Sequence, residues 1–183
     1  MTTMAEVAFR RGLVADAPAL ARFAADTFVE AFGAVTAPDD LTAHLANTYS
    51  PALQAAELAD PGMITLLALR DGAIVAYAQV RRNADAPAGI DARDTIEVSR
   101  FYADRSVRGS GVPQALMQQA LQAAIDLGGR HAWLGVWERN PRAIAFYRKL
   151  GFAPVGRKVY IVGSDHQTDH VMLLSNIETR VPQ

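Results

Sequence analysis

The sequence predicts a mixed α/β fold in which one sheet of about seven strands is flanked by about four helices. Two apolar runs joined by Asp71-Gly72 predict an antiparallel hairpin, because this dipeptide tolerates the positive φ of a two-residue turn. Residues 112–127 predict an amphipathic helix. The expected order is strand, helices, three strands, helix, strand, helix and two strands, which predicts a single domain over residues 1–183.

The composition fits one globular domain and limits its partners. The chain has 183 residues, of which 50% are hydrophobic, and 18 basic against 19 acidic side chains give a formal net charge of −1. We expect no nucleic-acid partner, because such binding depends on clustered Lys and Arg. The absence of cysteine excludes disulfides, thiol nucleophiles and cysteine-bound metals, and favours a cytoplasmic location.

No segment predicts export, a membrane span or a linker between domains. The N-terminus lacks a basic region followed by an apolar one, and no later segment reaches about 20 uninterrupted apolar residues. The longest loop expected, residues 83–93, is too short to join separate domains. We therefore expect neither a signal peptide nor a membrane partner.

The N-terminal third predicts one strand followed by three helices. The strand is expected over residues 7–10. Asp16 can cap the first helix, with Pro18 in its first turn, and apolar side chains recur there at helical spacing. Two more helices are expected, over residues 38–49 and from the cap at Ser50-Pro51 to the residue before Asp60.

The middle of the chain predicts three strands. The hairpin pairs residues 63–70 with residues 73–80, and a third strand covers residues 95–103. In the third strand the alternation of apolar side chains slips by one residue between Val98 and Phe101. A β-bulge, which inserts one extra residue into a strand, explains the slip.

The C-terminal half predicts two helices that alternate with strands. The helix of residues 112–127 ends at Gly128-Gly129. Asn140-Pro141 provides a side-chain cap and a proline at the first position of the next helix, which Gly151 closes. The remaining strands are expected over residues 132–136, 155–162 and 168–174.

The most informative segment is Arg-Gly-Ser-Gly-Val-Pro, residues 108–113, which opens a helix. A glycine-containing turn at a helix N-terminus presents unpaired N–H groups and the positive end of the helix dipole, which together can bind a pyrophosphate. A dinucleotide-binding fingerprint would need a third glycine where Gln114 stands, and a P-loop would need a Gly-Lys-Ser/Thr ending. An ordinary tight turn remains an alternative.

A second segment, Glu-Arg-Asn-Pro-Arg-Ala-Ile-Ala-Phe-Tyr-Arg-Lys-Leu-Gly-Phe, covers residues 138–152 and begins about 25 residues after the glycine turn. The two segments together resemble the GNAT acyltransferases, and the resemblance extends from Val7 to Leu174. It implies the GNAT fold with a mostly antiparallel sheet, and an acetyl-CoA-dependent N-acetyltransferase. The glycine turn is similar to the Gln/Arg-x-x-Gly-x-Gly/Ala motif that holds the pyrophosphate of acetyl-CoA. Pro113 departs from this motif, because it removes one N–H donor at the last position.

The resemblance implies which residues contact acetyl-CoA. The backbone of the strand before the turn is expected to pair with the pantetheine amides, because the bulge frees it from regular pairing. Asn140 is expected to serve both as a helix cap and as a cofactor contact, although the cap alone would explain it. The expected cofactor-binding residues are Phe101, Tyr102, Ala103, Arg108, Gly109, Ser110, Gly111, Val112, Pro113, Asn140 and Tyr147.

Two residues are expected to carry the chemistry. Transfer of an acetyl group from a thioester to an amine needs a neutral amine and a proton for the departing thiolate. Glu97 is the expected base, acting through a water, and an exposed strand carboxylate is the alternative. Tyr147 is the expected proton donor to the thiolate, and a core tyrosine in an apolar helix stripe is the alternative.

Longer motifs narrow the resemblance to the PaiA-type branch, which resembles spermidine/spermine acetyltransferases. They are residues 27–32, 135–152 and 162–173. A polyamine is therefore the favoured acceptor, and the amine of a peptide or protein is the alternative. Carboxylates in the first two helices could line the acceptor groove or form a solvated face: Asp26, Glu30, Asp39 and Asp40. The expected substrate contacts are Phe28, Glu30 and Phe32.

Other features carry weaker expectations. His166 and His170 flank Asp169, but no third strong ligand is evident, so we expect no metal. Trp133 and Trp137 are expected to pack in the core rather than to stack on a ligand. A non-catalytic acyl-CoA-binding module is the alternative to an enzyme, and the sequence is compatible with a homodimer.

Overall fold

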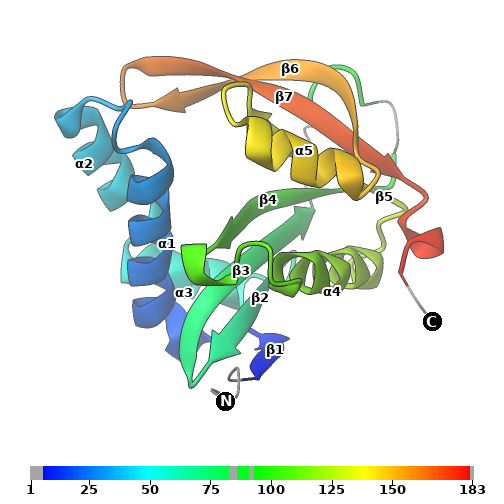
Figure 1. Cartoon of the computed structure of the whole chain (residues 1–183), viewed down its shortest axis with the longest axis horizontal. Coiled ribbons are helices and arrows are strands. Elements are labelled where there is room, and N and C mark those ends of the chain that lie inside the picture. Colours follow the sequence, from blue (N-terminus) through cyan, green and yellow to red (C-terminus); the bar gives the residue numbers. More distant parts are fainter. Residues whose placement is uncertain (1–5, 83–85, 91–92, 182–183) are drawn as a thin grey trace.

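The computed structural model describes residues 6–82, 86–90 and 93–181, and its centre is one seven-stranded sheet (Figure 1). Neighbouring strands are antiparallel, except β4 and β5, which are parallel. This arrangement confirms the predicted mixed, mostly antiparallel sheet. In spatial order the strands are β1 (Val7–Arg11), β2 (Met63–Arg70), β3 (Ala73–Arg82), β4 (Thr95–Ala103), β5 (His131–Trp137), β7 (Asp165–Ser175) and β6 (Ala153–Val162). The first five residues of the chain and part of the loop expected over 83–93 lie outside the described residues.

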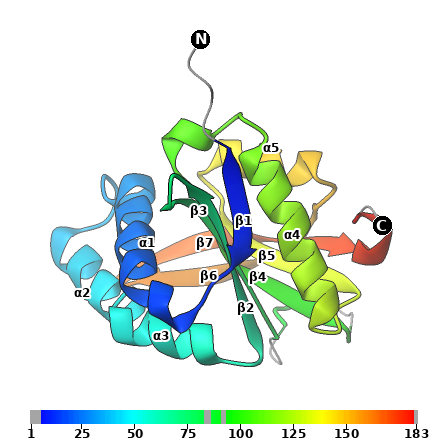
Figure 2. The same ribbon diagram turned by 90° about the horizontal axis from the view of Figure 1, so that it is seen from below.

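In the described residues five α-helices flank the sheet, and each lies in a segment where a helix was expected, although the overall estimate was about four. Figure 2 shows α4 on one side of β1 and β2, and α1, α2 and α3 on the other side. In chain order the helices are α1 (Ala17–Phe32), α2 (Pro38–Thr48), α3 (Pro51–Ala59), α4 (Val112–Asp126) and α5 (Pro141–Lys149).

Alternating side chains of β2 and β3 divide the core into two clusters. Ala68 and Ala76 belong to the cluster under α4 and α5, whereas Leu67 and Tyr77 belong to the cluster under α1. Successive strand residues point to opposite faces of a sheet, so each strand contributes to both clusters. The sheet is therefore buried on both faces where α4 and α1 cover it.

Several local signals in the sequence are confirmed. Asp71 and Gly72 have φ values of 52° and 79°, as a two-residue hairpin turn with two positive φ angles requires. The Ser50 hydroxyl accepts a hydrogen bond from the Leu53 N–H at 3.3 Å, and the Asn140 side chain accepts one from the Ala143 N–H at 3.1 Å. Both predicted caps of α3 and α5 are thus present.

Two expectations are wrong in detail. The Asp16 side chain does not cap α1, because its carboxylate accepts hydrogen bonds from the Arg10 guanidinium at 2.7 and 2.8 Å and from the Leu13 N–H at 2.8 Å. The last hairpin is also tighter than expected, since β7 begins at Asp165 and only Gly163-Ser164 separates it from β6. In the first case Arg10 and Leu13 bind the carboxylate that was expected to cap α1. In the second case pairing with β6 extends β7 to Asp165.

The strand β4 carries the feature that positions the site. Gln79 of β3 pairs with Arg100, and Val80 pairs with Val98, so Ser99 is the extra residue of a β-bulge, as predicted. On its other side β4 pairs with β5 only from Thr95 to Glu97. Beyond Glu97 the two strands no longer pair, and the sheet opens between them.

Candidate active site

A groove of about 270 Å³ lies where β4 and β5 part. Residues 98–103 of β4 form one wall, residues 135–137 of β5 form the other, and α5 contributes further side chains. We call this space the β4–β5 groove. Because β4 has no strand partner on this side, its peptide groups can pair with an extended ligand.

Most of the expected cofactor-binding residues line this groove. The exceptions are Ser110, Gly111 and Val112, which continue the turn beyond Gly109. The β4 backbone was expected to be freed from pairing by the bulge. Residues 101–103 instead stay paired with β3, and they are open toward β5 because β5 pairs with β4 only as far as Glu97. The residues that do line the groove are Phe101, Tyr102, Ala103, Arg108, Gly109, Pro113, Asn140 and Tyr147.

The glycine turn before α4 has the geometry of an anion site. Gly109 and Gly111 have φ values of 78° and 90°, and a Cβ at either position would meet nothing within 4 Å. Glycine is required here by the backbone conformation, not by crowding within the protein. In the described part of the chain the N–H groups of Gly109 and Gly111 have no hydrogen-bond partner. They therefore stay available to a phosphate at the start of α4.

Arginines surround this turn. A cavity of about 520 Å³ beside it, which we call the arginine cavity, shares Arg108 and Asn140 with the β4–β5 groove. The expected substrate contact Glu30 lies here, where its carboxylate pairs with Arg105 at 2.8 Å and with Arg108 at 2.7 Å. Burial raises the pKa of Glu30, but the hydrogen bonds from both arginines outweigh burial and leave this pKa below its ordinary value. The lining arginines are Arg105, Arg108, Arg139 and Arg142.

Tyr147 lies on α5 and lines the β4–β5 groove. Its ring makes edge contacts with the rings of Phe101, Phe146 and Phe152 at centroid distances of 6.3, 5.4 and 5.9 Å. Its hydroxyl makes no hydrogen bond to any residue that the structure describes. Burial raises the pKa of Tyr147, so the hydroxyl keeps its proton at neutral pH.

A second space of about 220 Å³, which we call the inner cavity, opens from the β4–β5 groove. The residues shared by both spaces lie at the bulge and on β5, together with one residue from α1. They are Phe32, Ser99, Arg100, Tyr102, Gly135 and Trp137. Ligands in the two spaces would therefore meet at the bulge.

Glu97 lines the inner cavity and not the groove. It is 4% exposed, so the alternative of an exposed strand carboxylate is wrong. Its carboxylate pairs with Arg81 Nε at 2.6 Å and lies 3.8 Å from Lys158 Nζ. The expected base is thus a buried carboxylate held by two cations.

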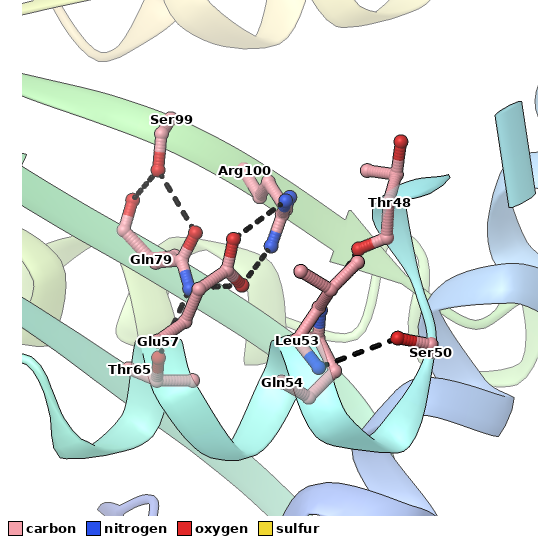
Figure 3. A network of polar contacts seen from close by, with 9 residues as sticks. All are labelled: Thr48, Ser50, Leu53, Gln54, Glu57, Thr65, Gln79, Ser99 and Arg100. Carbon is pink, nitrogen blue, oxygen red and sulfur yellow. Dashed lines mark hydrogen bonds and ion pairs between the residues drawn. The ribbon is translucent and has the colours of Figure 1, made fainter. Parts of the chain in front are cut away.

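A polar network fixes the bulge where the two spaces meet (Figure 3). The Arg100 guanidinium donates to both carboxylate oxygens of Glu57 on α3, at 2.5 and 3.0 Å. Gln79 donates to Glu57 at 3.2 Å and accepts from the Ser99 hydroxyl at 3.2 Å. The guanidinium also lies 5.3 Å from the centre of the Tyr49 ring. Because α3 and β3 both hold the bulge, Arg100 has a fixed position at the junction.

The remaining expected contacts are divided between core and cavity. Phe28 is fully buried, stacks on His44 at 4.5 Å, and lines none of the three cavities described above. Phe32 lines both the groove and the inner cavity. Trp133 is a core residue as expected, whereas Trp137 lines all three cavities and packs 5.5 Å from Phe32.

Sequence reasoning missed the cations of the inner cavity and singled out its second carboxylate only as a neighbour of two histidines. Arg81 and Lys158 lie in no motif that the sequence analysis used, and Asp169 lies in the segment of residues 162–173, which carried the resemblance but assigned it no role. Among residues 6–82, 86–90 and 93–181, no three His, Cys, Asp or Glu side chains are grouped to hold a metal ion. Within the same ranges no helix is long and apolar enough to cross a membrane.

Comparison with known proteins agrees with this geometry. The chain matches the acetyltransferase (GNAT) family over residues 23–152. The chain belongs to this family. It is therefore a GNAT-family N-acetyltransferase, and the expected enzyme class is confirmed.

This acetyltransferase has relatives that match most of its length. It is 37% identical over 158 residues to an uncharacterised N-acetyltransferase of Mycobacterium tuberculosis (strain ATCC 25618 / H37Rv). The aligned part covers 86% of this chain and 96% of that protein. The structure of a PaiA N-acetyltransferase from Thermoplasma acidophilum in complex with coenzyme A has a TM-score of 0.74 at 16% identity, over 93% of this chain and 99% of that chain. A Salmonella typhimurium structure with its cofactor acetyl-CoA has a TM-score of 0.64 at 18% identity, over 93% and 94% of the two chains. At these identities the two structures show the fold alone.

Proposed function

We propose that this chain transfers the acetyl group of acetyl-CoA to a primary amine of a small molecule, by direct attack while both substrates are bound. The observation that carries the proposal is the meeting of the β4–β5 groove and the inner cavity at the bulge of β4. An extended thioester in the groove and an amine in the inner cavity would reach each other there. A mechanism through a ternary complex needs this arrangement.

The residues of the groove fit acetyl-CoA. The pyrophosphate would lie on the glycine turn, where the N–H groups of Gly109 and Gly111 lie at the start of α4 without a hydrogen-bond partner among the described residues. Pro113 contributes no donor, but Arg108 and the other arginines of the arginine cavity supply positive charge at this end. The pantetheine amides would pair with residues 101–103 of β4 on the side left open by β5. Asn140 lines the groove while its side chain also caps α5, so its position is compatible with both expected roles.

Acetyl-CoA would supply an activated acyl group, and the chain would supply proton transfer and position. Tyr147 lines the groove and can give a proton to the departing sulfur, because burial keeps its hydroxyl protonated. A carboxylate of the inner cavity can take the proton of the attacking amine, and Glu97 and Asp169 are its two carboxylates. The charged amine must lose this proton before its nitrogen can attack.

The charges of the inner cavity favour an acceptor with one amine over the polyamine expected from the PaiA-type resemblance. Its lining holds three cations and two carboxylates, which are Arg81, Arg100 and Lys158, and Glu97 and Asp169. Arg100 is already paired with Glu57, and Glu97 with Arg81 and Lys158, so Asp169 is the one lining carboxylate without an ion pair to a described residue. The further ammonium groups of a polyamine would find no other carboxylate of the lining to pair with. A small acceptor with one amine brings no such further ammonium groups.

Two measurements test the proposed function. Acetyl-CoA in hundredfold excess over its Kd should add about 2.7 kcal/mol to the free energy of unfolding, which thermal unfolding detects. Thiol release from acetyl-CoA should then depend on the amine, across spermidine, an aminoglycoside, lysine and a short peptide. A thermal shift without thiol release from any amine would support the non-catalytic binding module instead. No thermal shift at millimolar acetyl-CoA would exclude both functions.

A further inference from the structure

Asp169 is a buried carboxylate in the inner cavity. It lies on β7, opposite Lys158 of β6 and Trp137 of β5, and it is 7% exposed. In the part of the chain that the structure describes, its carboxylate makes no hydrogen bond. A buried carboxylate without a donor is costly in a core, which suggests that its position serves a ligand.

Gly135 places this carboxylate beside the junction of the two spaces. A Cβ on Gly135 would lie 3.0 Å from Asp169 Oδ2, 2.5 Å from Lys158 Cε and 3.0 Å from Lys158 Nζ. Because Gly135 has no side chain, the side chains of Asp169 and Lys158 can lie directly over β5 at this position. Gly135 itself lines both the β4–β5 groove and the inner cavity. The Asp169 carboxylate thus lies next to the place where amine and thioester would meet.

Glu97 is less suited to take a proton at this place. Its Oε2 accepts a hydrogen bond from Arg81 at 2.6 Å, and its Oε1 faces Lys158 at 3.8 Å. A proton on that carboxylate would break an ion pair that is buried on the side of Glu97. Protonation of Asp169 breaks no hydrogen bond to a described residue and leaves Lys158 paired with Glu97.

We propose that Asp169 is the general base that removes a proton from the ammonium group of the acceptor, and that Lys158 is its positioning residue. This inference rests on the proposed function. The proton of the ammonium moves to a carboxylate oxygen of Asp169, and the nitrogen lone pair forms the bond to the acyl carbon while the carbon–sulfur bond breaks. The sulfur takes the proton of the Tyr147 hydroxyl, and a second proton from the acylated nitrogen restores that hydroxyl.

The charged surroundings of Asp169 agree with this role. Burial raises the pKa of Asp169 to about 6, Lys158 and His170 oppose this increase, and Glu138 adds to it. The Tyr160 hydroxyl, also on β6, lines the same cavity. A carboxylate with this pKa is ionised at pH 7 and binds a proton more readily than an ordinary aspartate, as a general base at neutral pH requires.

The test compares two nucleophiles that differ in their need for a base. One nucleophile is hydroxylamine, which is largely neutral at pH 7. The other is a primary amine, which is protonated at this pH; it is whichever of spermidine, an aminoglycoside, lysine and a short peptide the wild type acetylates fastest. Asp169→Asn should lower the rate of thiol release with the primary amine by about 10²–10⁴-fold and leave the rate with hydroxylamine within a few-fold of wild type. Glu97→Gln is the competing variant. Asp126→Asn, at an exposed carboxylate of α4 that accepts from Gln122, is the matched control.

Each outcome decides the assignment. Equal wild-type and Asp169→Asn rates with the primary amine would overturn it, and a loss confined to Glu97→Gln would make Glu97 the base. If Asp169→Asn lowers the rate equally with both nucleophiles, the assignment is also overturned, because a structural defect lowers both rates. The thermal shift with acetyl-CoA, measured on every variant, reports folding and cofactor binding. If the wild type releases no thiol with either nucleophile, the proposed function fails first and the base assignment fails with it.

Discussion

Replacing Tyr147 with phenylalanine removes one hydroxyl from the β4–β5 groove and keeps the aromatic volume that contacts Phe101, Phe146 and Phe152. Because the hydroxyl has no hydrogen-bond partner among the described residues, the change leaves no donor or acceptor unpaired. We therefore expect the free energy of unfolding to change by less than about 1 kcal/mol. Loss of the proton donor to the departing thiolate should lower kcat by about 10²–10⁴-fold, equivalent to about 3–5 kcal/mol in the activation barrier.

The assay is steady-state thiol release at saturating acetyl-CoA, combined with denaturant unfolding of the same preparations. Tyr77→Phe is a matched control, because Tyr77 is also a buried tyrosine whose hydroxyl lacks a hydrogen-bond partner, and it lines none of the three cavities. It should retain wild-type kcat. A Tyr147→Phe enzyme with the kcat of the Tyr77→Phe enzyme would remove Tyr147 from proton transfer and leave water as the proton source.

Three further changes test other parts of the site. Gly109→Val should abolish the thermal shift caused by acetyl-CoA, because a branched residue resists the φ of 78° on the glycine turn; a retained shift would place the pyrophosphate elsewhere. Lys158→Met should move the acidic limb of the kcat/KM pH profile to higher pH, since the Lys158 charge lowers the pKa of Asp169; an unchanged limb would contradict that pairing. Glu57→Gln should cost about 2–3 kcal/mol in urea unfolding, less than for a fully buried pair because the Glu57 side chain is 25% exposed, and a smaller loss would mean that Arg100 finds another partner.

Much of the fold could be predicted because its signals are local. The turn at Asp71-Gly72 needs only two residues that accept positive φ, and the bulge at Ser99 appears as a break in a two-residue alternation. The caps at Ser50 and Asn140 depend on N–H groups three residues away. None of these features requires knowledge of which distant strands pair.

Features that depend on how the elements lie in space could not be predicted in the same way. Asp16 has the sequence context of a helix cap, yet its carboxylate accepts hydrogen bonds from Arg10, six residues earlier on β1, and from the Leu13 N–H. The opening between β4 and β5 after Glu97 is likewise absent from either strand's own pattern, because it depends on where the pairing of these two strands ends, while β5 stays paired with β7 over its whole length. That opening creates the groove, so its position became known only with the structure.

The cofactor side and the acceptor side of the site differ in how much the sequence reveals of them. The groove takes most of its lining from two continuous segments, which are residues 98–114 and 135–147, and a continuous segment can carry a motif. The inner cavity takes a few residues from each of many elements, among them Arg81 of β3, Lys158 of β6 and Asp169 of β7. One or two residues of a strand are too few to form a recognisable motif.

The polyamine expected from the resemblance would need carboxylates near the bound acceptor, and the sequence offered those of the first two helices as one possibility. Glu30 pairs with Arg105 and Arg108 at the glycine turn, and Asp40 accepts a hydrogen bond from the Ser164 hydroxyl at 2.7 Å. Neither carboxylate lines the inner cavity, so neither can neutralise an amine bound there. The charges that an acceptor would meet come instead from strands, where cations outnumber carboxylates. If the acceptor binds in the inner cavity as proposed, the charges that it meets come from strand residues brought together by the sheet, and not from Glu30 or Asp40.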